Sequence, residues 1–400
     1  MKKKILATSL ALTMSLALVA CGESTISNTK TGSSIQNTST ETPDTPNQDT
    51  NTTTAQGQFV AKEVADGEFS YNHYYDFMLN NSTGNGIFSP ESMNSAFCLY
   101  SELLEDNDKQ TIQDYIGNRS YLTYQSSDSF KTLNRLWVNE NKEFDANINP
   151  IIKDNNIQYK LNTNDSAAAT KEKNDYVAKN TNNFITSTPT IFDSETVFDA
   201  MNVVYFKDSW KNGDKEMTTD NVTFHNDNQT TTDIPMMLDY DGSVRYTKNA
   251  HSYTMSYEDG FKFTVILPDD GYELKDIDLD AFINGDTEYL DCTSSLKIPE
   301  FETTSTYLAT PDNFGLQDGQ IKEEIYKYDV DKAQISQVAK IKFDRKGTEA
   351  AAVSEVYVTD ALEAEPPEPY HMVCDKPFAY YITDTLNDDI AFIGFVKNIE

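Results

Sequence analysis

Histidines, cysteines and carboxylates are the side chains of this sequence that could carry catalysis or bind a metal, and their spacing favours neither. The four histidines each lack a second His, Cys or Glu at the spacing of a metal ligand: His73, His225, His251 and His371. The sequence has no nucleophile elbow, phosphate loop or dinucleotide fingerprint. A solvated acidic surface is the simpler explanation of its 64 Asp and Glu residues. We therefore expect no enzyme, no catalytic residue, no metal and no cofactor.

One cysteine stands in a context that predicts modification of its own thiol. Three lysines at positions 2–4 precede an apolar run over residues 5–19, and Ala20 stands directly before Cys21. This is the pattern of a secretory signal, and the run is too short and too interrupted by hydroxyl residues to serve well as a spanning helix. Residues 18–21, Leu-Val-Ala-Cys, resemble the bacterial lipobox, in which the chain is cut before the cysteine and the thiol carries a diacylglycerol anchor. The sequence therefore predicts a signal peptide over residues 1–20 and a lipid anchor at Cys21.

The composition divides the rest of the chain into a tether and one large domain. Residues 21–57 start with the lipidated cysteine and continue with Ser, Thr, Asn, Gln, Asp and Pro, which bury too little apolar surface to fold. Residues 58–400 contain no second linker, so we expect a single domain there. The protein should be extracytoplasmic and lipid-anchored to the bacterial cell membrane.

The formal net charge of −32 limits the partners of the folded part. Lys and Arg form no run in residues 58–400, which argues against binding to nucleic acid or to anionic lipid. Cys98, Cys292 and Cys374 are an odd and widely spaced set, so the sequence predicts no disulfide framework. We expect a monomer that is stabilised by packing.

A segment near the C-terminus has the alternation that a strand needs to enter an existing sheet. Every second residue is small or β-branched and uncharged: Thr348, Ala350, Ala352, Ser354, Val356 and Val358. The intervening positions place Glu349 and Glu355 together on what would be the solvent face. No proline lies between Gly347 and Glu365 to remove a ladder hydrogen bond. The pattern predicts a segment that can become a central strand.

The elements that must position this segment are helices in the first part of the domain and strands in the last. Helical spacing occurs over 59–80, 175–185 and 274–283, and Ser89 followed by Pro90 marks a further helix start. Strand patterns occur at 87–88, 133–138, 202–206, 262–267, 378–382 and 390–396. This order indicates an α+β fold with a mainly antiparallel sheet.

Five separated segments resemble, in order, motifs of the serpin family and together span about residues 60–400. Residues 85–93 (NGIFSPESM) are similar to Asn-x-x-Phe-Ser-Pro-x-Ser-Ile, and residues 202–210 (NVVYFKDSW) to Asn-Ala-Ile-Tyr-Phe-Lys-Gly-x-Trp. The third joins residues 234–237, 265–268 and 298–301, the fourth is residues 347–352 (GTEAAA), and the fifth is residues 375–378 with 392–394.

The resemblance implies the serpin fold, with three β-sheets, eight or nine helices and an exposed reactive-centre loop. It also implies covalent suicide trapping, in which a serine or cysteine protease cleaves the loop, forms an acyl-enzyme and is carried across the molecule as the loop inserts. The hinge of that loop would be Gly347, Thr348, Glu349, Ala350, Ala351 and Ala352. The structural residues of the shutter region would be Asn85, Ser89, Pro90, Asn202 and Gln337. Gln337 stands where many members have a His that bonds the Asn, here Asn202.

The resemblance places the reactive bond at Ala361 and Leu362. A small residue such as Ala361 suits elastase-like proteases, whereas a register shifted to Leu362 would favour chymotrypsin-like or subtilisin-like enzymes. No Arg or Lys occurs from Gly347 to His371, which argues against trypsin-like targets.

Two departures from the family pattern keep an alternative open. Arg345 replaces the usual Glu two residues before the hinge glycine, so an acidic partner at the top of the sheet is lost or reversed, and the stretch before Asp375 is longer than usual. The alternative is a non-inhibitory serpin-fold surface lipoprotein for adhesion or ligand binding. The third hypothesis is a solute-binding lipoprotein of another fold.

Overall fold

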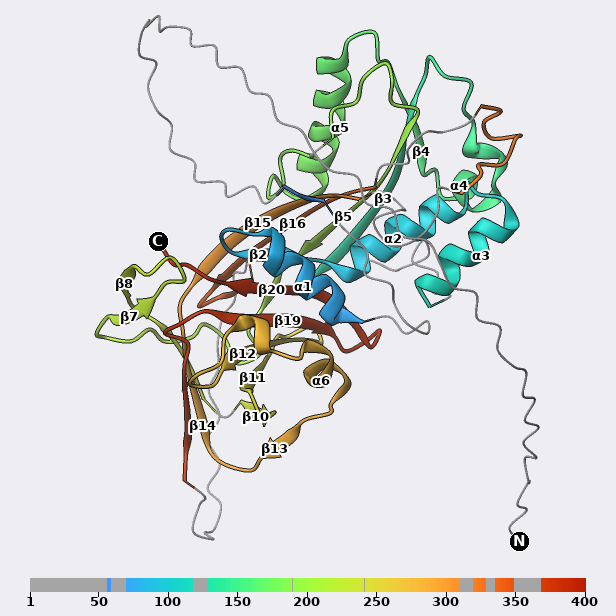
Figure 1. Cartoon of the computed structure of the whole chain (residues 1–400). Helices are drawn as coiled ribbons and strands as arrows, with labels where there is room; N and C mark the ends of the chain where they lie inside the picture. The colour runs from blue at the N-terminus through green and yellow to red at the C-terminus, as the bar shows by residue number, and fades with distance from the viewer. Residues whose placement is uncertain are drawn as a thin grey trace, which may run out of the picture. The chain divides into compact units, whose positions relative to one another are not determined.

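Three β-sheets and a two-stranded ribbon form the framework of the described structure (Figure 1). The computed structural model describes residues 56–58, 70–117, 129–188, 190–240, 242–309, 319–328, 335–348 and 368–400. All of them belong to one compact unit, Asn51–Glu400. The α+β fold with mainly antiparallel pairing is confirmed.

The eight-stranded sheet contains the strands that border the hinge. Its main path consists of β1 (Gln56–Gln58), β15 (Phe301–Ala309), β16 (Ile335–Asp344), β5 (Phe198–Phe206), β3 (Phe130–Asn139) and β4 (Gln158–Leu161). β5 pairs with β3 along its whole length, and β16 pairs with β15 from Phe343 to Ile335. All residues of β5 are buried, which explains its nearly continuous apolar sequence.

The two central strands of this sheet, β5 and β16, are joined at one end alone. Their parallel ladder consists of Ala200 with Ile335 and Met201 with Ser336. Within the described residues no ladder pair joins 202–206 of β5 to 337–342 of β16. We call these residues the unpaired stretch. Its far end is occupied by the short strands β17 (Gly347–Thr348) and β6 (Asp208–Ser209).

The seven-stranded sheet contains the predicted C-terminal strands. Its order is β13 (Glu288–Leu290), β10 (Ser243–Tyr246), β11 (Ala250–Ser256), β12 (Phe261–Pro268), β19 (Phe378–Asp384), β20 (Asp389–Val396) and β2 (Gly86–Phe88). The patterns at 262–267, 378–382 and 390–396 are confirmed as β12, β19 and β20. Every residue of β20 is buried.

The smaller sheets combine strands that precede the hinge segment in the chain with one strand, β18, that follows it. The three-stranded sheet has the order β18 (Tyr370–Val373), β14 (Ser294–Ile298) and β9 (Met237–Tyr240). β7 (Val222–His225) and β8 (Thr231–Ile234) form the ribbon. β18 is the first strand after the segment that is predicted to carry the reactive bond.

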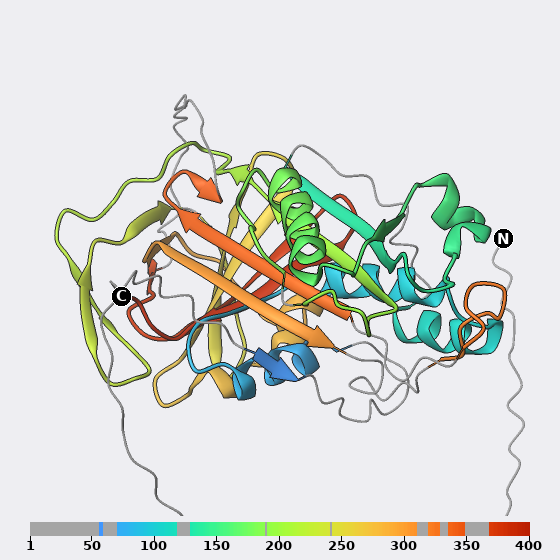
Figure 2. The ribbon, with the colours of Figure 1, turned by 90° about the horizontal axis from the view of Figure 1, so that it is seen from above.

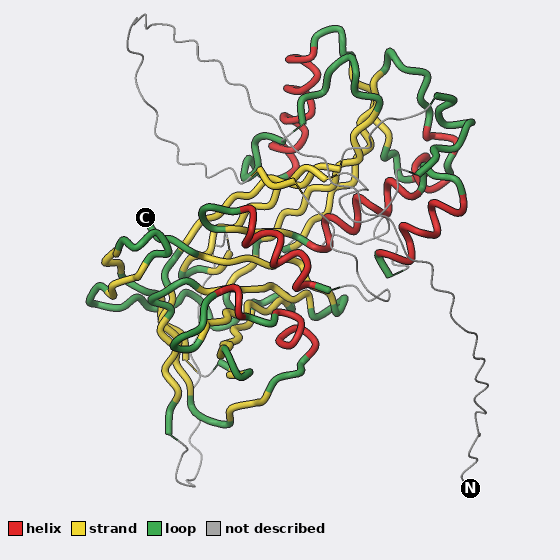
Figure 3. Tube along the Cα trace, viewed as in Figure 1, coloured by secondary structure: helices red, strands yellow, loops and turns green. Residues whose placement is uncertain are grey.

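The helices of the described ranges lie toward one side of the strands, away from the two-stranded ribbon (Figure 3). They are α1 (Tyr71–Asn81), α2 (Pro90–Ser101), α3 (Asp106–Tyr115), η3 (Ala146–Ile148), α4 (Pro150–Asp154), α5 (Ser166–Asn180), η4 (Leu274–Asp276) and α6 (Leu279–Asn284). The described part thus has six α-helices and two 3-10 helices, against the eight or nine helices implied for the whole chain. None of these helices has the length and apolar character needed to cross a membrane.

Helix α2 begins where the sequence predicts. The Ser89 hydroxyl oxygen accepts the Ser92 N–H at 3.1 Å, and Pro90 occupies the first turn, where its missing N–H costs nothing. All residues of α2 are buried, and the helix contacts β3, β5, β16 and β20. It therefore lies against the inner face of the eight-stranded sheet.

Two helix boundaries predicted from periodicity are wrong. The helix expected over 175–185 begins at Ser166, because the Asp165 side chain accepts the Ala168 N–H at 3.0 Å and three alanines follow. It ends at Asn180. The helix expected over 274–283 is divided into η4 and α6, because the Asp278 side chain caps a new helix start. In both cases the capping side chain decided the boundary.

Helix α5 covers the outer face of the eight-stranded sheet (Figure 2). Its buried residues are Ala169, Lys173 and Val177, at the spacing of one helix face. Ala169 and Val177 pack in one cluster with Met201 and Val203 of β5 and Val338 of β16. Any movement of β5 relative to β16 must therefore be accommodated beneath α5.

Candidate functional site

The first two hinge residues already form a short strand in the middle of the eight-stranded sheet, between β16 and β6. Gly347 and Thr348 of β17 pair antiparallel with Asp344 and Phe343 of β16. The same two residues pair antiparallel with Ser209 and Asp208 of β6, which continues β5. β17 therefore begins a central strand at the far end of the unpaired stretch.

The Thr348 side chain is buried beneath the sheet and hydrogen bonded. It is 1% exposed, and its hydroxyl lies 2.8 Å from the Tyr257 hydroxyl. Burial raises the pKa of Tyr257, so this hydroxyl keeps its proton. The buried orientation of Thr348 agrees with the inward alternation expected from the sequence.

Tyr257 is itself held by Trp210. The two rings stack with centroids 4.3 Å apart at an interplanar angle of 12°. The Trp210 indole N–H donates to the Asp344 carbonyl oxygen at 3.0 Å. The aromatic pair thus connects the end of β16 to the hydroxyl that contacts the hinge.

Gly347 occupies a backbone conformation and a space that exclude other residues. Its φ is +140°, a region that residues with a side chain rarely adopt. An added Cβ would lie 2.2 Å from the Asp208 carbonyl oxygen and 2.9 Å from the Ser209 Cα. Glycine is therefore required for the double pairing of β17.

Asp208 places a buried carboxyl group beside the hinge. Its oxygens accept the Ser209 N–H at 2.7 Å and the Asp259 N–H at 3.1 Å. Burial, with a further contribution from the nearby Asp259 and Glu258 carboxylates, raises the pKa of Asp208 to about 6. The strand that flanks Thr348 therefore changes charge near neutral pH.

A carboxylate lies close to residue 345, on Glu300 directly before β15. The backbone N–H of Arg345 donates to Glu300 Oε1 at 2.9 Å. The contact uses the backbone of residue 345, and the Arg345 residue itself is exposed.

At the other end of the unpaired stretch, Gln337 binds Ser89. Its Oε1 accepts the Ser89 N–H at 3.0 Å, and its Nε2 donates to the Ser89 carbonyl oxygen at 2.8 Å. Asn202 Nδ2 donates to Asn134 Oδ1 at 3.0 Å, whereas the side-chain oxygen Oδ1 of Asn202 is buried without a hydrogen-bond partner. The structure thus brings Ser89, Gln337 and Asn202 to one end of the sheet, with Gln337 bonded to Ser89.

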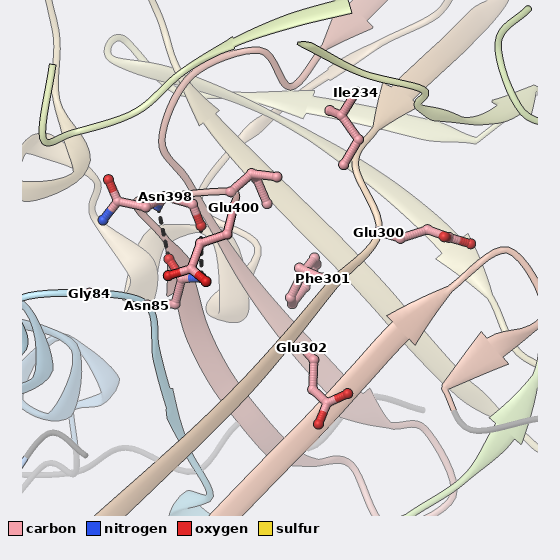
Figure 4. Close-up of a pocket in the computed structure, with 9 residues that line it drawn as sticks. Gly84, Asn85, Ile234, Glu300, Phe301, Glu302, Asn398 and Glu400 are labelled. Atoms are coloured by element: carbon pink, nitrogen blue, oxygen red, sulfur yellow. Dashed lines mark hydrogen bonds between the residues drawn. The ribbon is translucent and has the colours of Figure 1, made fainter. Parts of the chain in front are cut away.

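Asn85 lies away from this site and secures the C-terminal residues (Figure 4). Its Oδ1 accepts the N–H groups of Lys397 and Asn398, and its Nδ2 donates to the Asn398 carbonyl oxygen at 2.9 Å. A cavity of about 300 Å³ adjoins Asn85 and is lined in part by Glu300 and Glu302. Asn85, directly before β2, therefore holds the C-terminal residues Lys397 and Asn398 in place.

Several predicted site residues lie outside the described residues. They are Cys21, the hinge residues Glu349, Ala350, Ala351 and Ala352, and the reactive-bond residues Ala361 and Leu362. Among the described residues, no group of three or more His, Cys, Asp or Glu side chains is placed to hold a metal ion. Cys98, Cys292 and Cys374 are free thiols.

Sequence reasoning missed Tyr257, Asp208 and the buried pair Lys173 and Asp199. A signal existed for Asp199, because it is a carboxylate inside the otherwise apolar strand FDAMNVVYF and therefore needs a buried partner. Nothing local marks Tyr257, whose partner Thr348 is far away in the chain.

The described structure thus combines a sheet whose central strands leave an unpaired stretch with a two-residue strand, β17, at the far end of that stretch. The family model described as "Serpin (serine protease inhibitor)" matches residues 64–399. The chain therefore belongs to the serpin family. Its general function is that of a protease inhibitor rather than a catalyst, although some serpins are non-inhibitory.

Individual relatives agree with this family and with the fold. Alpha-1-antiproteinase of Rattus norvegicus is 27% identical over 381 residues, covering 84% of this chain and 88% of the relative. The native structure of the thermophilic serpin tengpin matches with a TM-score of 0.63 at 19% identity, covering 85% of this chain and 97% of that chain. Thyroxine-binding globulin in complex with thyroxine matches with a TM-score of 0.63 at 18% identity, covering 81% and 96%. The serpin fold is thereby confirmed.

Substituting Gly347 with alanine should displace the hinge from the sheet. The Cβ clashes with the Asp208 backbone, so the Gly347→Ala variant should lose about 1–3 kcal/mol of unfolding free energy and expose the loop more fully. Denaturant unfolding and limited proteolysis measure these effects. Gly271→Ala is the matched control, because Gly271 also has a positive φ, of +89°, with nothing within 4 Å of the added Cβ. Equal losses in both variants would refute the close-contact argument.

Titration of Asp208 should make stability depend on pH. Its pKa is about 6 in the folded state and near 4 in an unfolded chain, so the folded state binds the proton more tightly. The favourable contribution is present below the unfolded pKa and is lost as the pH rises through about 6. Relative to Asp208→Asn, the unfolding free energy should fall by about 2 kcal/mol between pH 4 and 7. Parallel pH profiles of the two proteins would contradict this assignment.

Proposed function

We propose that the protein is a serine protease inhibitor that acts by covalent suicide trapping with reactive-loop insertion. The observation that carries the proposal is the pairing of Gly347 and Thr348 with both β16 and β6. A strand that already pairs on both sides can be extended by adding hydrogen bonds along the unpaired stretch, whose backbone groups would gain partners.

The register of β17 on its two sides predicts one consistent path for that extension. Counting from Thr348, the β16 side places Val356 opposite Ile335, and the β6 and β5 side places it opposite Ala200. Ala200 and Ile335 are the residues that pair directly with each other in the described structure. The same antiparallel strand therefore fits both edges without a register shift.

The inward positions along this path suit small side chains. Ala350 would lie between Phe206 and Ile341, and Ala352 between Val204 and Ala339, all of which are buried. Ser354 would lie between Asn202 and Gln337. The Ser354 hydroxyl would then donate to the side-chain oxygen Oδ1 of Asn202, which is buried without a hydrogen-bond partner in the described structure.

The outward positions differ between the two glutamates of the segment. Glu349 would lie between Lys207 and Lys342, where opposite charges face each other across strands. Glu355 would lie between Met201 and Ser336, which are both buried. Both carboxylates would share one face of the inserted strand, as the alternation predicts, but at Glu355 this face is covered by α5, which packs on Met201. Insertion to that depth requires a rearrangement beneath α5.

The reactive bond and the target proteases are proposed from the sequence. Ala361 and Leu362 would form the bait, with elastase-like enzymes as targets of Ala361 and subtilisin-like or chymotrypsin-like enzymes as targets of Leu362. The antiproteinase relative supports protease inhibition in general.

A second cavity supports ligand binding as an alternative function. A space of about 640 Å³ lies beside β18 and the end of β12 and is lined in part by His225, Leu267, Tyr370 and His371. One structure of similar fold is thyroxine-binding globulin with thyroxine bound. Ligand binding by a non-inhibitory surface lipoprotein is therefore the alternative, and failure of protease trapping would favour it.

Thr348→Arg should convert the inhibitor into a substrate, because an unpaired guanidinium would have to enter the sheet. Incubation with an elastase should give a covalent, denaturant-resistant band with wild type and cleavage without that band with the variant. Cleavage should also raise the melting temperature of wild type by tens of degrees, since about 2 °C follows from each added 1 kcal/mol in a domain of this size.

Glu349→Arg is the matched control, because it introduces the same side chain one residue further on. The guanidinium would face outward and stay solvated, although it would replace the favourable contact of Glu349 with Lys207 and Lys342 by a repulsion. Trapping should therefore be weaker than in wild type but clearly stronger than in Thr348→Arg. A covalent band with Thr348→Arg as strong as with wild type, or an unchanged melting temperature after cleavage of wild type, would remove the trapping mechanism.

The membrane attachment is a separate proposal, supported by the lipobox-like sequence at Cys21. Cys21→Ser should release the protein from bacterial membranes without loss of inhibition, because lipidation needs the thiol. Fractionation of cells that express each form measures this release. Membrane association of the variant equal to that of wild type would exclude the anchor at Cys21.

A further inference from the structure

We propose that four buried residues form a clamp that holds β5 and β16 together beside the unpaired stretch, at the end where Ala200 pairs with Ile335. They are Lys173, Asp199, Thr190 and Ser336. The opening of this clamp would set the rate at which a strand inserts beyond Ser354. These are positioning residues, and the proposal rests on the proposed strand-insertion function.

The clamp is centred on a lysine inside an apolar helix face. Lys173 lies between Ala169 and Val177 on the buried face of α5, and its side chain is 0% exposed. Its ammonium group forms an ion pair with Asp199 and donates to the Thr190 hydroxyl. The Asp199 side chain is 2% exposed. A buried charge of this kind is tolerated only with its partner in place.

Asp199 connects three elements of the fold. Its Oδ2 binds Lys173 of α5 and accepts the Thr190 hydroxyl at 2.9 Å. Its Oδ1 accepts the Ser336 hydroxyl of β16 at 3.4 Å. One carboxylate therefore joins β5 to the helix above it and to the neighbouring strand.

The position of the clamp in the sheet gives it a mechanical role. Asp199 is adjacent to Ala200 in β5, and Ser336 is a member of the Met201 and Ser336 pair. These are the residues where β5 and β16 pair directly within the described residues. A strand that extends past Ser354 to Val356 must separate both pairs and break the bond between Ser336 and Asp199. Lys173 of α5 binds Asp199 of β5. If β5 moves away from β16, it must therefore either break this ion pair or carry α5 with it.

The clamp therefore predicts that insertion depends on strand length. A strand of residues 348–353 ends opposite Val203 and Val338, above the clamp. A strand of residues 348–358 reaches the level of Asp199 and must open it. A general loosening of the protein would change both processes, whereas a clamp acts on the longer strand alone.

The test measures the annealing of synthetic peptides of residues 348–353 and 348–358 to the intact protein, by native mass spectrometry. The Lys173→Met and Asp199→Asn double variant removes both charges. It should accelerate annealing of the longer peptide by at least about tenfold, equivalent to 1.4 kcal/mol, and leave the shorter peptide unchanged. Ser336→Ala, which removes one hydroxyl and keeps the ion pair, should accelerate the longer peptide less and remains informative if the double variant folds poorly.

The same helix offers a matched control. Lys171 and Asp175 form an ion pair at 2.5 Å with side chains 73% and 64% exposed, so Lys171→Met with Asp175→Asn makes the same chemical change away from the sheet. An equal effect of this control, or equal acceleration of both peptides, would overturn the clamp. Unchanged annealing in the double variant and in Ser336→Ala, while wild type traps protease, would overturn the clamp and leave the proposed function intact. If wild type neither anneals peptide nor traps protease, both proposals fail.

Discussion

The incomplete hydrogen bonding between β5 and β16 is the constraint on which the rest of this structure depends. Both strands are fully paired on their outer sides, to β3 and β15, but meet each other at Ala200 with Ile335 and Met201 with Ser336. Backbone N–H and C=O groups in a buried sheet are strongly driven to find partners. Under the proposed function, a sheet that leaves such edges apart would store free energy that an added strand releases, so that its state would be under kinetic rather than equilibrium control.

The two ends of the unpaired stretch are held by different chemistry. At the end near β17, a neutral hydroxyl pair between Tyr257 and Thr348 and the carboxyl group of Asp208 surround the start of a strand. At the other end, an ion pair covered by α5 lies beside the last direct ladder pairs. Hydroxyl contacts can be exchanged at small cost, whereas a buried charge must keep a partner. The first end is therefore suited to initiating insertion and the second to resisting its completion.

The acidic composition of the chain makes its buried charges informative. With a formal charge of −32, most carboxylates must be solvated, and those that are buried need a specific reason. Asp199 and Asp208 are both buried and both lie on the strand path that borders the unpaired stretch. Because buried ionic groups contribute little net stability, their placement here fits control of a conformational change better than support of the core.

The amino-acid sequence by itself determined the local features: the α2 start at Ser89 and Pro90, the apolar strands, the alternation from Thr348 onward and the family motifs. These depend on capping, on the period of two along a strand and on side-chain size, which are properties of neighbouring residues. The tertiary structure alone decided that Tyr257 meets Thr348, that Gln337 binds Ser89, and that Lys173 pairs with Asp199. Such contacts join elements far apart in the chain. The position and register of each packed element select their partners, so no local pattern contains them.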